Sequence, residues 1–236
     1  MYEIRDDMLV LGSQRDRLTL VENTDLLNMA KIGRASTPLD LMTYDPNDQQ
    51  PSIFFVPESP HQAILTVFNW TESARSHALK LADLGLPAEH TFRALDVLNP
   101  NAPVTLQGGT VRIEGQIPES VKVIKLIDDN VSPGAPSVNA QVPSVANAGE
   151  TIHLAAQTEG GVPALEYHWD FGDGTGASGP KVSHAYTRAA PFTIRLTVDG
   201  VDGTPAVQIF SINVTGNLRA LHNLTDNRRF QEPTDH

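Results

Sequence analysis

The sequence predicts a mainly β protein, built as two antiparallel β-sandwiches in series after a short helical segment. From Pro38 onward, apolar residues alternate with a period of two in short runs, which is typical of strands half-buried in a sheet. Turn-forming residues such as Pro46, Gly85 and Gly108 separate these runs at the spacing expected of a sandwich. The chain carries 17 glycines and 17 prolines in 236 residues, which favours turn-rich β structure over a helix bundle.

The N-terminal segment, residues 1–37, differs from the rest because its apolar residues recur at helical spacing. Residues 8–12 form a short apolar run that ends in glycine. Leu26 to Ile32 are expected to form a helix. Asn23 or Thr24 can cap the start of this helix, and Gly33 ends it.

The two sandwiches are expected at residues 38–128 and 138–215. A Pro- and Gly-containing linker at 129–137 joins them, and a polar tail follows at 216–236. In the first sandwich, the alternation predicts strands near residues 39–42, 52–56, 62–70, 76–81, 91–96, 104–107, 110–114 and 120–127. In the second, it predicts strands near residues 138–142, 151–156, 165–169, 182–185, 191–198 and 206–214.

Composition excludes several classes of function. A net charge of −11 argues against nucleic acid or an anionic membrane as a partner, since phosphate binding needs clustered Lys and Arg. The absence of cysteine excludes disulfides, thiolate catalysis and Cys-based zinc sites. The first twelve residues lack the basic and apolar regions of a signal peptide, and no apolar run approaches the ~20 residues that span a bilayer. The chain as written is therefore expected to be cytoplasmic.

A motif in the second half carries a family resemblance. Residues 167–175 read YHWDFGDGT, residues 183–187 read SHAYT, and residues 191–198 alternate as a closing strand. This combination resembles a PKD domain, an Ig-like β-sandwich often appended to secreted bacterial enzymes and cell-surface proteins. The resemblance implies a spacer or binding module in a parent protein that is secreted or periplasmic. It also implies that Trp169 fills the space between the sheets.

The first half carries a second resemblance. The strings DDMLVLG, RLTLVENTDLLNMAKIGR, TVFNWTE, LADLGLP and SVKVIKLID resemble, in order, the end of α-galactosidase-like glycoside hydrolases. The resemblance implies that residues 1–37 are the end of a (β/α)₈ barrel and that residues 38–128 are the C-terminal sandwich. In that family the catalytic carboxylates lie on earlier barrel strands, so they map onto no residue here. Asp6 and Asp7 cannot replace them, because adjacent residues of a strand point to opposite faces.

The DFGDG turn suggests a calcium site. Asp170 and Asp173 offer the hard oxygen ligands that Ca²⁺ prefers, but two carboxylates do not fill its ~6–8 positions. The alternative is that both side chains bond backbone N–H groups of the turn. His168 and His184 lie nearby and could bind a metal or a ligand. If Trp169 faces the core, His168 faces solvent, and no third ligand stands at metal-type spacing in the sequence.

Aromatic residues of the first sandwich suggest a carbohydrate site. Trp70, with Phe54, Phe55 and Phe68, could form a platform on which sugars stack. Because side chains alternate along a strand, at least one of Phe54 and Phe55 faces outward. The alternative to a sugar-binding platform is that these aromatic side chains pack in the core. Trp70, Phe55 and His168 are the residues predicted to bind a ligand.

Three functions remain open at this point. The first is a non-catalytic accessory region of a glycoside hydrolase, acting as a spacer and as a carbohydrate- or protein-binding module. The second is a cryptic hydrolase of esters or lactones, in which calcium at Asp170 or Asp173 positions water. The third is a structural module that self-associates. Apolar faces on the N-terminal helices are expected either to fold back on the first sandwich or to drive a homodimer.

Overall fold

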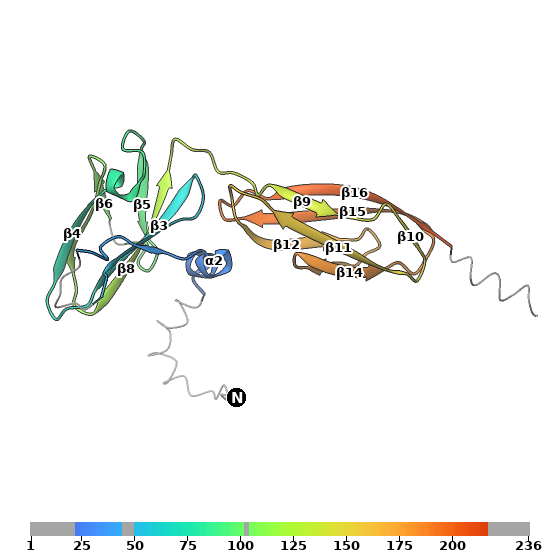
Figure 1. Ribbon diagram of the computed structural model, residues 1–236, viewed down its shortest axis with the longest axis horizontal. Coiled ribbons are helices and arrows are strands. Elements are labelled where there is room, and N and C mark those ends of the chain that lie inside the picture. Colours follow the sequence, from blue (N-terminus) through green and yellow to red (C-terminus); the bar gives the residue numbers. More distant parts are fainter. Residues whose placement is uncertain (1–21, 44–49, 102–103, 217–236) are drawn as a thin grey trace, which may run out of the picture. The chain divides into compact units, whose positions relative to one another are not determined.

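The computed structural model describes residues 22–43, 50–101 and 104–216 (Figure 1). These residues form two compact units, the first chiefly of residues up to 136 and the second chiefly of residues from 137 on. Strands dominate both units, and the helix α2 (Thr24–Ile32) precedes the strands of the first. The predicted mainly β fold is therefore confirmed. The apolar run at residues 8–12 and the tail from residue 217 lie outside the described residues.

The first unit is a sandwich of two antiparallel sheets. The larger sheet has the strand order β1-β2-β3-β8-β5, and the smaller has the order β4-β7-β6. A 3₁₀ helix, η1 (Leu81–Leu84), follows β4. The strands are β1 (Thr37–Pro38), β2 (Ile53–Pro57), β3 (Gln62–Asn69), β4 (Arg75–Lys80), β5 (Phe92–Asp96), β6 (Thr105–Gln107), β7 (Thr110–Gln116) and β8 (Ser120–Asp128).

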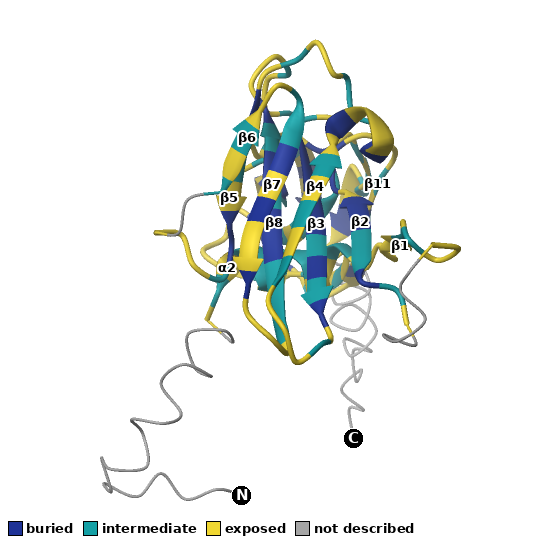
Figure 2. Cartoon of the chain, turned by 90° about the vertical axis from the view of Figure 1, so that its left-hand side faces the viewer, coloured by how far each residue is buried: buried dark blue, intermediate teal, exposed yellow. Residues whose placement is uncertain are grey.

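The core of this unit lies between the two sheets. Alternate residues of β3, namely Ala63, Leu65 and Val67, face it and are at most 2% exposed. Val111 and Ile113 of β7 belong to the same cluster and come from the smaller sheet. Figure 2 shows buried and exposed positions alternating along β7, as expected of a strand with one face on the core. Burying each Leu, Val or Ile side chain of this set stabilises the fold by roughly 1.5–3 kcal/mol.

Helix α2 is capped at both ends by residues that the sequence predicts. The side chain of Asn23 accepts a hydrogen bond from the Leu26 backbone N–H at 3.1 Å, which satisfies an otherwise unpaired donor of the first turn. Gly33 follows the helix in the left-handed conformation, with φ 63°, and its N–H bonds the Met29 carbonyl. Both predicted caps are therefore confirmed.

The same helix covers the face of the larger sheet that points away from the core. Leu26 and Met29 pack against a cluster that includes Ile64 of β3. Asp25, in the first turn, forms an ion pair with Lys125 of β8 at 2.7 Å. The helix thus folds back on the first sandwich, which is one of the two outcomes expected for an apolar helical face. A homodimer through the N-terminal helices stays a prediction. The apolar face of α2 does not support it, because that face packs on the sheet.

The predicted strand at residues 39–42 is wrong. Residues 39–43 form a bend and turn, and the strand before them, β1, is only two residues long. Asp40 explains the difference, because its carboxylate accepts hydrogen bonds from the backbone N–H groups of Ser52 at 2.8 Å and Ile53 at 3.0 Å. The carboxylate occupies backbone N–H groups with which a continued strand would have to pair, so the ladder ends and the chain turns.

The second unit also contains two sheets. The larger has the order β10-β16-β15-β12-β13, in which β10 runs parallel to β16, and the smaller has the order β14-β11-β9. Its strands are β9 (Val138–Gln141), β10 (Val145–Asn147), β11 (Thr151–Thr158), β12 (Ala164–Asp170), β13 (Gly176–Ser178), β14 (Lys181–Ala185), β15 (Ala190–Gly200) and β16 (Ala206–Thr215).

Trp169 lies in the interior of this unit, as predicted. Its side chain is 3% exposed, and its indole N–H donates to the Gly179 carbonyl at 3.0 Å. Gly172 follows with φ 75°, and a Cβ there would lie 2.3 Å from the Thr193 carbonyl oxygen. Only glycine fits this position, which explains Gly172, the first glycine of the DFGDG turn.

Candidate functional site

Asp170 and Asp173, the predicted calcium ligands, accept hydrogen bonds from residues of their own turn. An Asp170 carboxylate oxygen accepts from the Gly172 N–H at 2.9 Å. One Asp173 oxygen accepts from the Thr175 N–H at 3.0 Å and from the Thr175 hydroxyl at 2.6 Å. These bonds are the backbone-capping alternative considered from the sequence. A calcium site at this turn stays a prediction, and it would have to share oxygens that already hold the turn.

The second oxygen of Asp173 binds His184. Nε2 of His184 lies 2.9 Å from this oxygen, and the imidazole stacks on Phe171 with ring centres 4.1 Å apart. Partial burial opposes ionisation of Asp173, but hydrogen bonds from Thr175 and His184 outweigh it and lower the pKa of this carboxyl. The Tyr186 hydroxyl donates to the Phe171 carbonyl at 2.9 Å, and burial raises the pKa of Tyr186 to about 12. His184 is thus a structural residue of the turn.

His168 occupies the opposite face of its strand from Trp169 and is exposed, as predicted. Its Nε2 lies 3.4 Å from a carboxylate oxygen of Glu166 and 3.2 Å from one of Asp199. Glu166 is two residues away on β12, whereas Asp199 comes from β15. The sequence could not show the second neighbour, because only the order of strands in the sheet brings Asp199 beside His168.

Three aromatic rings of the first unit form a surface that we call the aromatic platform: Phe54, Phe68 and Trp70. Trp70 lies parallel to Phe68, with ring centres 4.3 Å apart and an interplanar angle of 6°. Phe54 meets Phe68 edge to face at 5.8 Å. The indole N–H of Trp70 donates to the Pro51 carbonyl at 3.0 Å, so the ring is fixed although 37% of the residue is exposed.

A hollow of about 420 Å³ opens beside the platform. It is lined by Phe68, Trp70, Glu119, Ser120 and Val121. Glu119 has φ 49° and is the one non-glycine residue with positive φ in the described part of the chain. Such backbone strain costs about 1–3 kcal/mol and is concentrated at functional sites. Glu119 could not be found from the sequence, because its conformation depends on the tight turn between β7 and β8.

Phe55, predicted to bind a ligand, belongs to the core instead. It is 7% exposed and pairs with Leu65 of β3, whose side chain faces the interior. Phe54 pairs with Thr66 and therefore points to the opposite face, beside Phe68. The predicted platform thus keeps Phe54, Phe68 and Trp70 and loses Phe55, because the register with β3 decides which of Phe54 and Phe55 faces outward.

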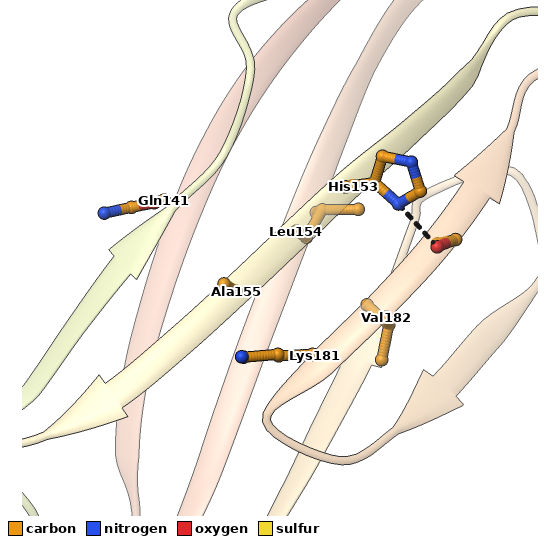
Figure 3. Close-up of a pocket in the computed structure, with 7 residues that line it drawn as sticks. Gln141, His153, Leu154, Ala155, Lys181 and Val182 are labelled. Carbon is orange, nitrogen blue, oxygen red and sulfur yellow. Dashed lines mark hydrogen bonds between the residues drawn. The ribbon is translucent and has the colours of Figure 1, made fainter.

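Another hollow, of about 340 Å³, lies on the smaller sheet of the second unit (Figure 3). Gln141, His153 and Lys181 contribute polar side chains to it from three neighbouring strands. Nδ1 of His153 lies 2.8 Å from the hydroxyl of Ser183, which is directly opposite on β14. This contact is an ordinary cross-strand pair between exposed residues.

A buried carboxyl lies under helix α2. Glu58 is 3% exposed and accepts a hydrogen bond from the Gln62 side-chain amide at 2.9 Å. Burial raises the pKa of Glu58 to about 7. The positive charge of Lys125 lowers this pKa, and the negative charge of Asp25 raises it. The group therefore titrates near neutral pH, which composition could not reveal.

Comparison with known protein families bears on the second unit. A family model described as PKD domain matches residues 133–214. The second unit is similar to PKD domains. This confirms the resemblance predicted from the WDFGDGT and SHAYT elements. Among the described residues no helix is both long and apolar enough to cross a membrane. No curated protein matches the chain.

Solved structures add distant likenesses. One describes promiscuous carbohydrate-binding modules of the β-sandwich superfamily, with 22% identity over 36% of this chain and 36% of that chain, at a TM-score of 0.33. One is the PKD1 domain of Vibrio cholerae metalloprotease PrtV, with 20% identity over 34% of this chain and 95% of that chain, at a TM-score of 0.26. Another is the PKD1 domain of Vibrio anguillarum Epp, with 25% identity over 36% of this chain and 100% of that chain, at a TM-score of 0.29. This chain spans about a third of the first structure. All three TM-scores lie below 0.5, so no function is carried over from them.

Proposed function

We propose that this chain is a non-catalytic binding and spacer region, whose first unit binds carbohydrate on the aromatic platform. The observation that carries the proposal is the parallel stack of the exposed Trp70 on Phe68, beside an open hollow. The similarity of the second unit to PKD domains supports a role as a spacer.

The platform has the chemistry that a sugar ring requires. The C–H groups of a pyranose are apolar on one face, and an exposed indole offers a flat apolar surface of matching size. The Trp70 ring is already held by the Pro51 carbonyl and by Phe68, so little freedom is lost on binding. Glu119 and Ser120, at the rim of the hollow, can hydrogen-bond sugar hydroxyls.

The parent enzyme is a separate question. We propose that this region accompanies a glycoside hydrolase from the sequence resemblance of residues 6–128 alone. Calcium-assisted hydrolysis of esters or lactones has less support, because the oxygens of Asp170 and Asp173 are engaged within their own turn. We therefore place the binding activity on the first unit.

Affinity electrophoresis in gels that contain soluble polysaccharides tests the proposal. The panel should include galactomannan, xylan, β-glucan and mannan, and wild-type protein should be retarded by at least one. Trp70→Ala should weaken binding about fivefold, since an aromatic contact contributes about 1 kcal/mol. Trp70→Phe should retain part of the binding.

Leu95→Ala is the matched control, because Leu95 is a large hydrophobic residue, 46% exposed, on the same sheet but outside the platform. Its retention should equal that of wild type. Two results would refute the proposal: no retardation of wild type by any member of the panel, or equal retention of wild type and Trp70→Ala.

A further inference from the structure

One imidazole and two carboxylates converge on the larger sheet of the PKD-like unit. Glu166 and His168 are two residues apart on β12, so both point to the same face of the sheet. Asp199 lies on β15, the strand next to β12. The three ligand atoms, one from each side chain, all lie within 4.8 Å of one another.

The two distances from His168 are close to those between ligands of one metal ion. Ligands about 2.0–2.2 Å from a tetrahedral zinc ion lie about 3.3–3.6 Å apart. Nε2 of His168 lies 3.4 Å from the Glu166 oxygen and 3.2 Å from the Asp199 oxygen. Both distances are at or beyond the usual upper limit of about 3.2 Å for an N–H···O hydrogen bond. The single Nε2 atom could also donate only one hydrogen, and it faces two acceptors.

We propose that Glu166, His168 and Asp199 form a surface site for a divalent transition-metal ion of the Zn²⁺ type. Imidazole nitrogen with carboxylate oxygen is a ligand set that Zn²⁺ accepts, with water in the remaining position. One nitrogen ligand among three also favours Zn²⁺ over Ca²⁺, which takes oxygen ligands. The site goes beyond the carbohydrate binding proposed above and lies on the other unit.

The electrostatics favour a cation at this position. Two carboxylates converge here on one imidazole, and a divalent ion would neutralise their negative charge. The carboxylates repel each other when the site is empty, and side chains that are 46–48% exposed can rotate by the small amount needed to close on an ion. Because the ligands come from two adjacent strands, a bound ion also crosslinks β12 and β15 and stabilises the native unit.

Isothermal titration of the tag-free full chain with ZnCl₂ at pH 7.5 tests the proposal. We expect one site per chain and a higher melting temperature of the PKD-like unit in the presence of Zn²⁺. His168→Ala should weaken Zn²⁺ binding by about tenfold or more, as should Asp199→Asn. Co²⁺ bound to wild type should show visible absorption bands of a nitrogen–oxygen site, and His168→Ala should lose them. Ca²⁺ should not displace the Co²⁺.

His153→Ala is the matched control, because His153 is an exposed strand histidine of the same unit and its Nδ1 contacts the hydroxyl of Ser183. It should bind Zn²⁺ as wild type does. Circular dichroism establishes that each variant is folded. The proposal is overturned if wild type binds no Zn²⁺, if His168→Ala binds it as tightly as wild type, or if His153→Ala loses binding to the same extent as His168→Ala.

Discussion

Glu58 makes the stability of the first unit depend on pH in a direction opposite to that of most carboxyls. Its pKa is about 7 in the folded protein, against an ordinary value of 4.5. Between these two values, the folded state binds more protons at this residue than the unfolded state does. The free energy of unfolding should therefore fall as pH rises from about 4.5 to 7, and then stay level with respect to this group.

The size of the effect follows from the same two values. A difference of about 2.5 pKa units corresponds to roughly 3 kcal/mol at 1.36 kcal/mol per unit. Residual interactions in the unfolded chain offset part of a difference of this kind, so we expect about 1–2 kcal/mol. Glu58→Gln removes the titration and keeps an oxygen that can accept from Gln62. This variant should be about 1–2 kcal/mol more stable than wild type at pH 8 and nearly equal to it at pH 4.5.

Urea unfolding followed by ¹H–¹⁵N spectra provides the assay. The chain has two tryptophans, and the indole N–H signal of Trp70 reports on the first unit separately from that of Trp169 in the second. Glu114→Gln, at an exposed position of β7, is the control and should show no pH-dependent difference. The reasoning fails if Glu58→Gln is less stable than wild type at pH 8, or if the difference between the two is the same at both pH values.

Three further changes test other parts of the molecule. Trp169→Ala should destabilise the PKD-like unit by about 3–5 kcal/mol in urea unfolding, and a loss below about 1 kcal/mol would contradict its place in the core. Glu119→Gly should raise the unfolding free energy of the first unit by about 1 kcal/mol, because glycine adopts positive φ without strain; a lower stability would show that the turn is not strained. If calcium binds the DFGDG turn, millimolar Ca²⁺ should raise the melting temperature, and Asp170→Asn with Asp173→Asn should abolish the rise; identical melting in Ca²⁺ and in EDTA would exclude the site.

Local signals in the sequence predicted local structure well. Asn23 and Gly33 fix the ends of α2 through their own backbone and side-chain chemistry, so their roles could be read without the fold. Trp169 could be placed in the core from the alternation around it and from the family resemblance. For the aspartates of the DFGDG turn, the sequence left a calcium site and turn capping open, and the capping bonds are present because Asp bonds backbone N–H groups two residues ahead.

Features that depend on strand pairing could not be predicted. Alternation required that Phe54 and Phe55 face opposite sides, but only the register with β3 shows that Phe55 is the buried one. Asp199 reaches His168 because β15 lies next to β12, which no local spacing reveals. The raised pKa of Glu58 likewise arises from burial beneath a helix that is distant in sequence.

The short strand β1 has a consequence for how the protein behaves at high concentration. The next strand, β2, reads IFFVP, and a run of this kind with a free edge can recruit strands from other chains into fibrils. Leu39 donates its N–H to the Ile53 carbonyl, and the Asp40 carboxylate occupies the N–H groups of Ser52 and Ile53. Pro38, with no N–H of its own, offers no hydrogen-bond donor to a further strand. One bent loop thus closes the edge at which an aggregate would otherwise begin to grow.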